Sequence, residues 1–263
     1  MLNSVDSQQR PLHERISEAI PFICNICGST NKAKLIDLDR EIPSCICGSN
    51  VRWRSLIHIL SLKLFGTDLA LPHFPKSDEV GVGLSDDGSY AIPLAQKLNY
   101  TNTYYHQEPR LDITSIADRE GLFDFIISSD VFEHVPPPVQ IVFRNSYQLL
   151  RPGGLLILTV PYTKEPDTVE HFPELYDYRL IEKDNSHILQ NTTRDGQTQV
   201  FDNLIFHGGT GETLEMRRFS ESSVVRELET AGFGEIKIHN EPALYHGIYH
   251  LQDWALPISA TKF

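Results

Sequence analysis

The sequence predicts an α/β protein built on a mostly parallel sheet, and three stretches carry this prediction. In residues 77–89 an alternating apolar pattern is followed by a Gly-x-Gly turn and then by the start of a helix. This order is typical of a strand–turn–helix unit in which the helix N-terminus binds a ligand. Residues 123–129 form a nearly continuous apolar run, as expected of a strand in a parallel sheet covered on both faces. A second such run, residues 155–160, follows a predicted helix.

The glycine stretch, residues 77–89, also indicates the charge of its ligand. A dinucleotide site sets its pyrophosphate on helix-end N–H groups, with a third glycine beside them. Here Ser85 stands at the third position, and the carboxylates of Asp86 and Asp87 that follow would repel a diphosphate, which disfavours a nicotinamide reductase. With Glu79 at the strand end, they favour a ligand that carries ammonium or sulfonium charge, such as S-adenosylmethionine. The alternative is a packed strand–helix joint that binds nothing.

Composition and charge restrict the class of partner. The chain has 263 residues, of which 40% are hydrophobic and 22% charged, as in ordinary globular proteins. Its net charge of −12 disfavours nucleic acid, because Lys and Arg contacts to phosphates supply most of that affinity. No apolar run approaches the roughly 20 residues of a membrane span, and the N-terminus is polar. We therefore expect a cytoplasmic protein that binds neither nucleic acid nor membrane.

The cysteines predict a metal site near the N-terminus. All four lie in residues 24–47, as the pairs Cys24/Cys27 and Cys45/Cys47, and each pair is followed by glycine. Two such pairs supply four thiolate ligands for a tetrahedral Zn²⁺ ion. The second pair has one residue fewer between its cysteines than the usual Cys-x-x-Cys. Unliganded thiols and two disulfides are the alternatives.

Residues 51–65 predict a helix that follows the cysteines. Apolar residues recur on one face at helical spacing, while Arg52 and Arg54 occupy other faces. In one interpretation this helix docks the cysteine-rich module on the rest of the protein. In the other, the two arginines face an anionic part of a substrate.

Two later motifs carry a resemblance to a known family. After the glycine stretch come Phe123–Val135, with the sequence FDFIISSDVFEHV, and Arg151–Tyr162, with the sequence RPGGLLILTVPY. In this order they resemble class I S-adenosylmethionine-dependent methyltransferases of the type 11-like kind, and the cysteine-rich start resembles the zinc ribbon of a bacterial subset. The resemblance implies a Rossmann-like, seven-stranded, mostly parallel sheet with helices on both faces, plus a small N-terminal four-cysteine zinc ribbon. We expect a zinc-ribbon module and docking helix in residues 1–70, a methyltransferase domain in 71–263, and a substrate-capping insertion at about 162–212.

The resemblance also implies positions in the cofactor site. Tyr104 stands where the family has an acidic residue that accepts hydrogen bonds from both ribose hydroxyls. Asp112 would accept from the adenine amino group and Ile113 would pack on the ring, although Asp112 could instead cap a turn. His134 is either a hydrogen-bonded wall residue or catalytic. The expected cofactor residues are Glu79, Gly81, Gly83, Ser85, Asp86, Tyr104, Asp112, Ile113, Asp130, Val131 and His134.

The expected reaction is in-line displacement of the sulfonium methyl group by an acceptor. We expect a small-molecule or saccharide hydroxyl, which needs a nearby base. His171 and His207, which follow the strand at residues 155–160, are the candidate catalytic residues. The alternative is a non-catalytic binding protein on the same cofactor fold, which the non-family residue Tyr104 favours.

The remaining expected elements follow from local patterns. We expect a helix over about 89–98 capped by Ser89, with Pro93 in its first turn, and a helix over about 139–150. Strands are expected at 100–106, at 236–238 and, antiparallel, within 248–258. A further strand is expected to end near Asp112. Further predictions are a hairpin turn at Asp195–Gly196 and a helix that Ser220 caps and Gly232 ends.

Overall fold

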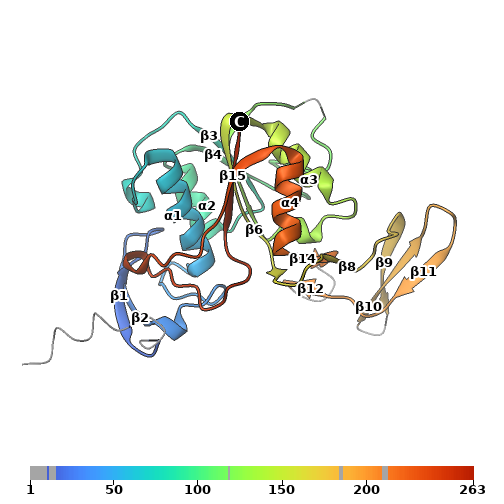
Figure 1. Cartoon of the computed structure of the whole chain (residues 1–263), viewed down its shortest axis with the longest axis horizontal. Coiled ribbons are helices and arrows are strands. Elements are labelled where there is room, and N and C mark those ends of the chain that lie inside the picture. Colours follow the sequence, from blue (N-terminus) through green and yellow to red (C-terminus); the bar gives the residue numbers. More distant parts are fainter. Residues whose placement is uncertain (1–10, 12–15, 118, 184–185, 209–212) are drawn as a thin grey trace, which may run out of the picture.

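A six-stranded sheet with the strand order β15-β16-β6-β5-β3-β4 forms the centre of the molecule (Figure 1). The structure is a computed structural model that describes residues 11, 16–117, 119–183, 186–208 and 213–263. Strands β3, β4, β5 and β6 run parallel, whereas β16 is antiparallel to both of its neighbours. The strands are β3 (Val80–Leu84), β4 (Asn99–Thr103), β5 (Phe123–Ser129), β6 (Leu150–Thr159), β15 (Phe233–Ile238) and β16 (Ile258–Lys262).

This sheet confirms the Rossmann-like, mostly parallel fold and differs from the expectation in the number of its strands. The described residues form six strands in this sheet instead of seven. The segment expected to end a further strand near Asp112 makes only an isolated bridge between Tyr104 and Arg110. The last strand begins at Ile258, where its predicted range ended.

Helices cover both faces of the sheet (Figure 1). On one face lie α1 (Val51–Phe65) and α2 (Gly88–Ala95), packed with Phe125, Ile127 and other side chains of the sheet. On the other face lie α3 (Gln140–Leu149) and α4 (Glu221–Ala231), packed with the alternate residue Ile126. Successive strand residues point to opposite faces, so the apolar run of β5 contributes side chains to the apolar clusters on both faces of the sheet, as expected of a strand covered on both faces.

The helix ends follow local capping chemistry. Ser220 accepts from the backbone N–H of Ser223 at the start of α4, and Gly232 ends that helix in the left-handed conformation, both as predicted. For α2 the predicted cap is wrong, because the Asp87 carboxylate, not Ser89, accepts from the backbone at the helix start. Pro93 consequently lies inside α2 and not in its first turn.

The N-terminal module joins the core on the α1 face. Strands β1 (Ala19–Ile23) and β2 (Thr30–Lys34) form an antiparallel pair, and short 3-10 turns follow at η2 (Leu35–Asp37) and η3 (Leu71–His73). Buried residues of this module share one apolar cluster with α1, α2 and the sheet. The helix at residues 51–65 therefore packs the module onto the sheet.

An insertion extends from the end of β6 and carries a small sheet away from the main body (Figure 1). This sheet has the strand order β11-β10-β9, and the predicted Asp195–Gly196 turn joins β10 to β11. Residues 209–212 of the expected insertion lie outside the described residues. The strands are β7 (Tyr162–Thr163), β8 (Val169–Glu170), β9 (Asp177–Lys183), β10 (Ser186–Thr192), β11 (Thr198–Phe201), β12 (Phe206–His207), β13 (Thr213–Leu214) and β14 (Arg217–Ser220).

Two short 3-10 turns complete the fold, η4 (Phe132–His134) and η5 (Leu244–His246). In the described part of the chain, no helix combines the length and the apolar character needed to cross a bilayer.

Candidate functional site

The loop after β3 is held by side chains of β4. Ser85 has a left-handed backbone, with φ of 57°, and its N–H donates to the Thr103 carbonyl. Asp86 turns inward and is 4% exposed; its carboxylate accepts from the Tyr100 hydroxyl and its N–H donates to Asn102. Burial raises the pKa of Asp86 to about 7. Asp86 is thus a buried carboxyl group beside the carboxyl end of the sheet.

The glycines of β3 face protein side chains. A Cβ on Gly81 would lie 2.0 Å from the Phe125 ring, and one on Gly83 would lie 1.9 Å from the Tyr100 hydroxyl oxygen. The Tyr100 and Asp86 side chains thus occupy the space beside Gly83. Glu79 precedes β3 and lies at the amino end of that strand, opposite the end that carries Ser85.

The other predicted cofactor residues lie where β4 ends and beyond it. Tyr104 directly follows β4, and its hydroxyl accepts from the Asn102 amide at 3.2 Å. Asp112 Oδ1 accepts from the backbone N–H and the hydroxyl of Thr114, so this carboxylate does cap a turn. Ile113 is buried in the apolar core.

Asp130, at the carboxyl end of β5, pairs with arginines of the N-terminal module. Its backbone is left-handed, with φ of 54°. Arg40 donates to both carboxylate oxygens, at 3.0 and 2.6 Å, and Arg52 lies 3.1 Å from Oδ2. Burial alone would raise the pKa of Asp130, but the charges of Arg40 and Arg52 outweigh it and lower that pKa. Asp130 is therefore an ionised carboxylate; Val131 follows it, partly buried against the core.

The two arginines of the predicted helix have different partners. Arg52 reaches the sheet edge, where it donates to the Ser129 hydroxyl at 2.6 Å. Arg54 is fully buried and donates to Ser44, to Ser49 and, at 2.9 Å, to the Gly247 carbonyl. Arg54 thus joins the cysteine-rich module to the C-terminal segment, whereas Arg52 faces the candidate site.

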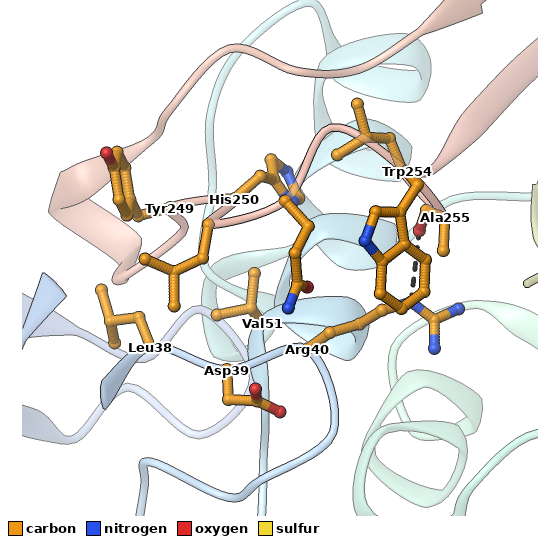
Figure 2. Close-up of a pocket in the computed structure, with 11 residues that line it drawn as sticks. Leu38, Asp39, Arg40, Val51, Tyr249, His250, Trp254 and Ala255 are labelled. Atoms are coloured by element: carbon orange, nitrogen blue, oxygen red, sulfur yellow. Dashed lines mark hydrogen bonds between the residues drawn. The ribbon is translucent and has the colours of Figure 1, made fainter. Parts of the chain in front are cut away.

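Arg40 is a site residue that the sequence reasoning missed. A small cavity separates residues 38–51 from residues 249–256, and Arg40 crosses it to donate to the Ala255 carbonyl at 3.2 Å (Figure 2). Its guanidinium then continues to Asp130. No spacing pattern marked Arg40, because its partners lie far away in the sequence.

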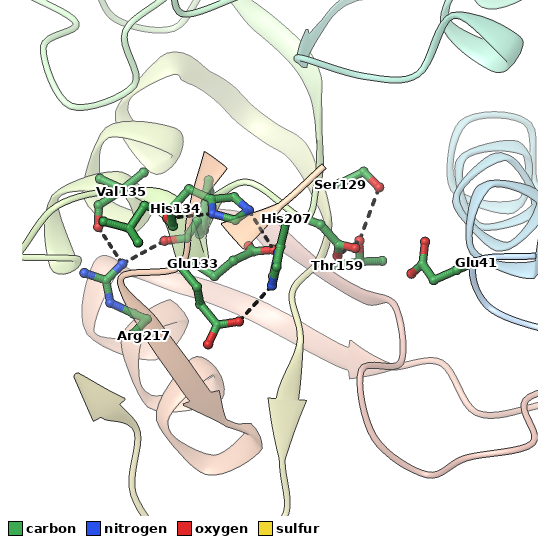
Figure 3. Close-up of polar contacts among 12 residues, drawn as sticks. Glu41, Ser129, Glu133, His134, Val135, Thr159, His207 and Arg217 are labelled. Atoms are coloured by element: carbon green, nitrogen blue, oxygen red, sulfur yellow. Dashed lines mark hydrogen bonds and ion pairs between the residues drawn. The ribbon is translucent and has the colours of Figure 1, made fainter. Parts of the chain in front are cut away.

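A second polar cluster lies on η4 and the insertion (Figure 3). Glu215 Oε1 lies 2.7 Å from His171 Nε2, and Glu215 Oε2 lies 2.9 Å from His207 Nε2. The rings of His207 and His134 meet edge to face, with centroids 4.8 Å apart. Both candidate catalytic histidines therefore share one carboxylate, which sequence reasoning did not identify. Glu133, which precedes His134, completes the cluster.

Backbone hydrogen bonds bring these segments together. The Met216 N–H donates to the Glu133 carbonyl at 2.8 Å, and the His171 N–H donates to the Met216 carbonyl at 2.9 Å. Arg217 is fully buried and donates to the carbonyls of Phe132 and Val135, which fixes η4 (Figure 3). The insertion is thereby anchored on the carboxyl edge of the sheet.

The charges of the cluster follow from burial and pairing. The hydrogen bond to Glu215 raises the pKa of His207, and burial lowers the pKa of His134. Burial would raise the pKa of Glu215, but hydrogen bonds from His207 and His171 lower it overall. Burial, with repulsion from Asp130, raises the pKa of Glu133. The cluster thus combines an ionised carboxylate, a buried carboxyl group and three imidazoles.

The four cysteine sulfur atoms also converge. Their Sγ atoms all lie within 4.8 Å of one another, with Cys24 and Cys47 at 3.7 Å and Cys27 and Cys45 at 3.6 Å. Disulfide sulfurs lie about 2.05 Å apart, so these are free cysteines, not disulfides. Ligands about 2.3 Å from a tetrahedral Zn²⁺ ion lie about 3.8 Å apart, so the four sulfurs have the spacing of a zinc site.

Comparisons with known proteins give one family match and several partial ones. A family model described as a methyltransferase domain matches residues 66–234. The ubiquinone biosynthesis O-methyltransferases of Psychrobacter cryohalolentis and Psychrobacter arcticus are each 27% identical over 106 residues, covering 40% of this chain. That match covers 37% of the length of each curated relative.

Solved structures also align with the chain. The glycopeptide N-methyltransferase MtfA, complexed with S-adenosylmethionine, aligns with a TM-score of 0.44 and 14% identity, over 74% of this chain and 91% of that one. An S-adenosylmethionine-dependent methyltransferase from Clostridium acetobutylicum aligns with a TM-score of 0.42 and 15% identity, over 81% and 99% of the two chains.

Proposed function

This chain belongs to the family of class I methyltransferase domains, and we propose that it transfers the methyl group of S-adenosylmethionine to a hydroxyl group of a small molecule or saccharide. The observation that carries the proposal is the pairing of His171 and His207 with the one carboxylate of Glu215. A hydroxyl is a weak nucleophile at neutral pH, so an acceptor of this kind benefits from a positioned base.

The carboxyl ends of β3, β4 and β5 are the proposed cofactor site. Open α/β sheets bind ligands at this edge, and Ser85, Tyr104 and Asp130 each directly follow one of these strands. Asp112 uses only Oδ1 toward described residues, which leaves Oδ2 to accept from the adenine amino group. Glu79 is left out of the proposed site, because it lies at the other end of β3.

His171 is the proposed general base. Glu215 accepts from Nε2–H of His171, which leaves Nδ1 with the lone pair that takes the acceptor proton. The same carboxylate stabilises the imidazolium that then forms. His207 shares Glu215 and is the second candidate.

A structural Zn²⁺ ion on Cys24, Cys27, Cys45 and Cys47 is part of the proposal. The sulfur spacing fits a tetrahedral site, and four protein ligands leave no open position for catalysis. The ion would hold the loop that carries Arg40 against the sheet edge. Its proposed contribution is therefore to folding and to the placement of Arg40 and Arg52.

Cofactor binding and acceptor choice test the proposal separately. Titration calorimetry with S-adenosylhomocysteine should show one site, and Asp112→Ala should weaken it by about 1–3 kcal/mol if an adenine donor loses its partner. Radiolabelled S-adenosylmethionine is then offered to paired acceptors that share a skeleton and differ in a hydroxyl or an amine.

Methylation of the hydroxyl member is the expected result. Binding of S-adenosylhomocysteine without transfer to any acceptor favours the non-catalytic alternative. Binding of NAD(H) instead of S-adenosylhomocysteine overturns the proposal.

A further inference from the structure

We propose that Glu133, His134 and His207 bind a divalent transition-metal ion, such as Mn²⁺, Fe²⁺ or Zn²⁺, at the carboxyl edge of the sheet. This is a second metal site, distinct from the four cysteines. Binding of the ion is independent of the proposed methyl transfer, and only its role toward the acceptor rests on that function. Two imidazoles and one carboxylate are a donor set that such ions share.

The distances between the donor atoms suit one ion. One ligand atom from each of the three residues lies within 4.8 Å of the other two, and Glu133 Oε1 lies 3.5 Å from His134 Nε2. Two ligands at about 2.1 Å from an ion lie about 3.0 to 4.2 Å apart, depending on the angle between them. Glu133 Oε1 and His134 Nε2 already have such a separation, the His207 nitrogen lies within 4.8 Å of both, and Figure 3 shows the three side chains grouped together.

Each histidine has one nitrogen fixed and the other left for a metal. His134 Nδ1–H donates to the Leu214 carbonyl at 2.9 Å, which leaves Nε2 with its lone pair. His207 Nε2 lies 2.9 Å from Glu215 Oε2, so this nitrogen carries the proton that faces the carboxylate, and Nδ1 has no hydrogen-bond partner among the described residues. Histidines that ligate metals almost always donate their second N–H to a carboxylate or a carbonyl. Both rings already have this support.

Glu133 supplies the independent observation. Its side chain is 0% exposed, and neither carboxylate oxygen has a hydrogen-bond partner among the described residues. Burying a carboxyl group without partners is costly, so a cation or a proton must satisfy it. His134 Nε2 lies 3.5 Å from Glu133 Oε1, so these two donor atoms face one another.

The charged side chains around the site favour the binding of a dication. Two guanidinium groups and four carboxyl groups lie at this edge: Arg40, Arg52, Glu41, Asp130, Glu133 and Glu215. A bound metal ion would hold Glu133 in its ionised form, and the four carboxylates would then exceed the two guanidinium groups by two charges. A divalent ion balances this excess.

The ion would assist the acceptor. A dication withdraws electron density from a nearby hydroxyl and makes its proton easier to remove. His171 would take that proton, the oxygen electron pair would form the bond to the methyl carbon of S-adenosylmethionine, and the carbon–sulfur electron pair would return to sulfur. The products are a methyl ether and S-adenosylhomocysteine, with one proton released.

Mn²⁺ binding tests the site without any methyl acceptor or cofactor. Mn²⁺ favours oxygen and nitrogen donors over thiolates, so the full chain with zinc on its cysteines keeps the two sites apart. Electron paramagnetic resonance of free Mn²⁺ should show one bound ion per chain. Glu133→Gln and His134→Gln should each weaken binding by at least ~10-fold, and Glu215→Gln, which orients His207, by about 10-fold.

The controls distinguish the loss of this site from a general effect of substitution on the fold or on Mn²⁺ binding elsewhere. His58 pairs with Asp68 at 2.8 Å outside the cluster, so His58→Gln should leave Mn²⁺ binding unchanged. His207→Gln on the more exposed insertion side is a second test if the buried variants fail to fold. No Mn²⁺ binding, or binding that all three ligand variants retain, overturns the site and assigns to Glu133 a proton shared with His134. Because no acceptor is present, that outcome leaves the proposed methyl transfer untouched.

Discussion

The cysteine cluster and the histidine–carboxylate cluster are assembled in opposite ways. The four cysteines come from one continuous stretch, residues 24–47, and their sulfurs converge within that stretch. The histidine cluster comes from η4, the residue after β8, β12, and the residue after β13. A local cluster can form and stabilise its own segment, whereas a cluster gathered from distant segments depends on a fold that already exists. We therefore expect the first to govern folding and the second to govern chemistry.

The largest expected effect comes from the cysteines. Cys27→Ser with Cys47→Ser should reduce the zinc content from one ion per chain to near zero and unfold the region around residues 20–50 first. Structural zinc contributes about 10–16 kcal/mol in isolated zinc-finger peptides, so its loss should exceed any single side-chain effect. Elemental analysis and hydrogen exchange measure the two results.

His171→Ala is the control for this change, because it should keep one zinc per chain. Protein that carries no zinc, yet keeps this region protected while all four thiols titrate freely, would refute the zinc site.

The next effect concerns the second cluster. His171→Ala should lower turnover by ~10²- to 10⁴-fold, the usual contribution of a positioned base, with little change in cofactor affinity or in the denaturation midpoint. Steady-state kinetics and calorimetry measure this contrast. His73→Ala is the matched control, because His73 is an exposed histidine on η3. Full activity in His171→Ala with collapse in His207→Ala moves the base to His207, and activity in both removes the histidine base.

Substitution of Gly83 tests whether the glycine stretch serves the stability of the fold or the binding of the cofactor. Its Cβ would overlap the Tyr100 hydroxyl and Asp86, so Gly83→Ala should cost about 1–3 kcal/mol of the free energy of unfolding through overpacking. Gly88→Ala is the control, because its nearest neighbour lies at 3.4 Å and its backbone is not left-handed. Urea denaturation measures both. Unchanged stability with lost S-adenosylhomocysteine affinity would show instead that Gly83 leaves space for the cofactor.

Elements with a strong local pattern were predictable to the residue. The apolar run Phe123–Ser129 is β5, and the helix predicted over 51–65 is α1. Ser220 and Gly232 were identified because capping depends on neighbouring residues alone. Asp87 was missed as a cap, since the sequence Ser-Asp-Asp-Gly-Ser offers several capping side chains and local preference does not choose among them.

The candidate site was predictable only in part. His171 and His207 were found from their position after the strand at residues 155–160, but Glu215, which pairs with both, was not. Arg40 and Arg217 act through carbonyl and carboxylate groups distant in the sequence, so no spacing marks them. The strand expected before Asp112 is absent from the described residues because that segment pairs only at one bridge.

The smallest expected effect concerns Asp86. The sequence predicts it as a cofactor-binding residue, and in the structure it contacts side chains of β4. Its pKa rises from 3.8 to about 7 through burial, so the folded protein binds this proton more tightly than the unfolded chain does. Its contribution to stability is therefore greatest at low pH and falls as pH rises toward 7, by at most about 1.4 kcal/mol per pH unit.

Asp86→Asn removes this titration, so the fall in unfolding free energy between pH 5 and pH 7 should be smaller in the variant than in the parent protein. Asp195→Asn, at an exposed turn whose pKa is lowered by its hydrogen bond from Thr193, should not reduce that fall. Urea denaturation at both pH values measures the difference. If Asp86 also faces the sulfonium charge, S-adenosylmethionine should gain affinity over S-adenosylhomocysteine as pH rises, because only the charged ligand favours the ionised carboxylate. Equal pH dependence for both ligands, together with the stability change, would place Asp86 with the residues that hold the fold.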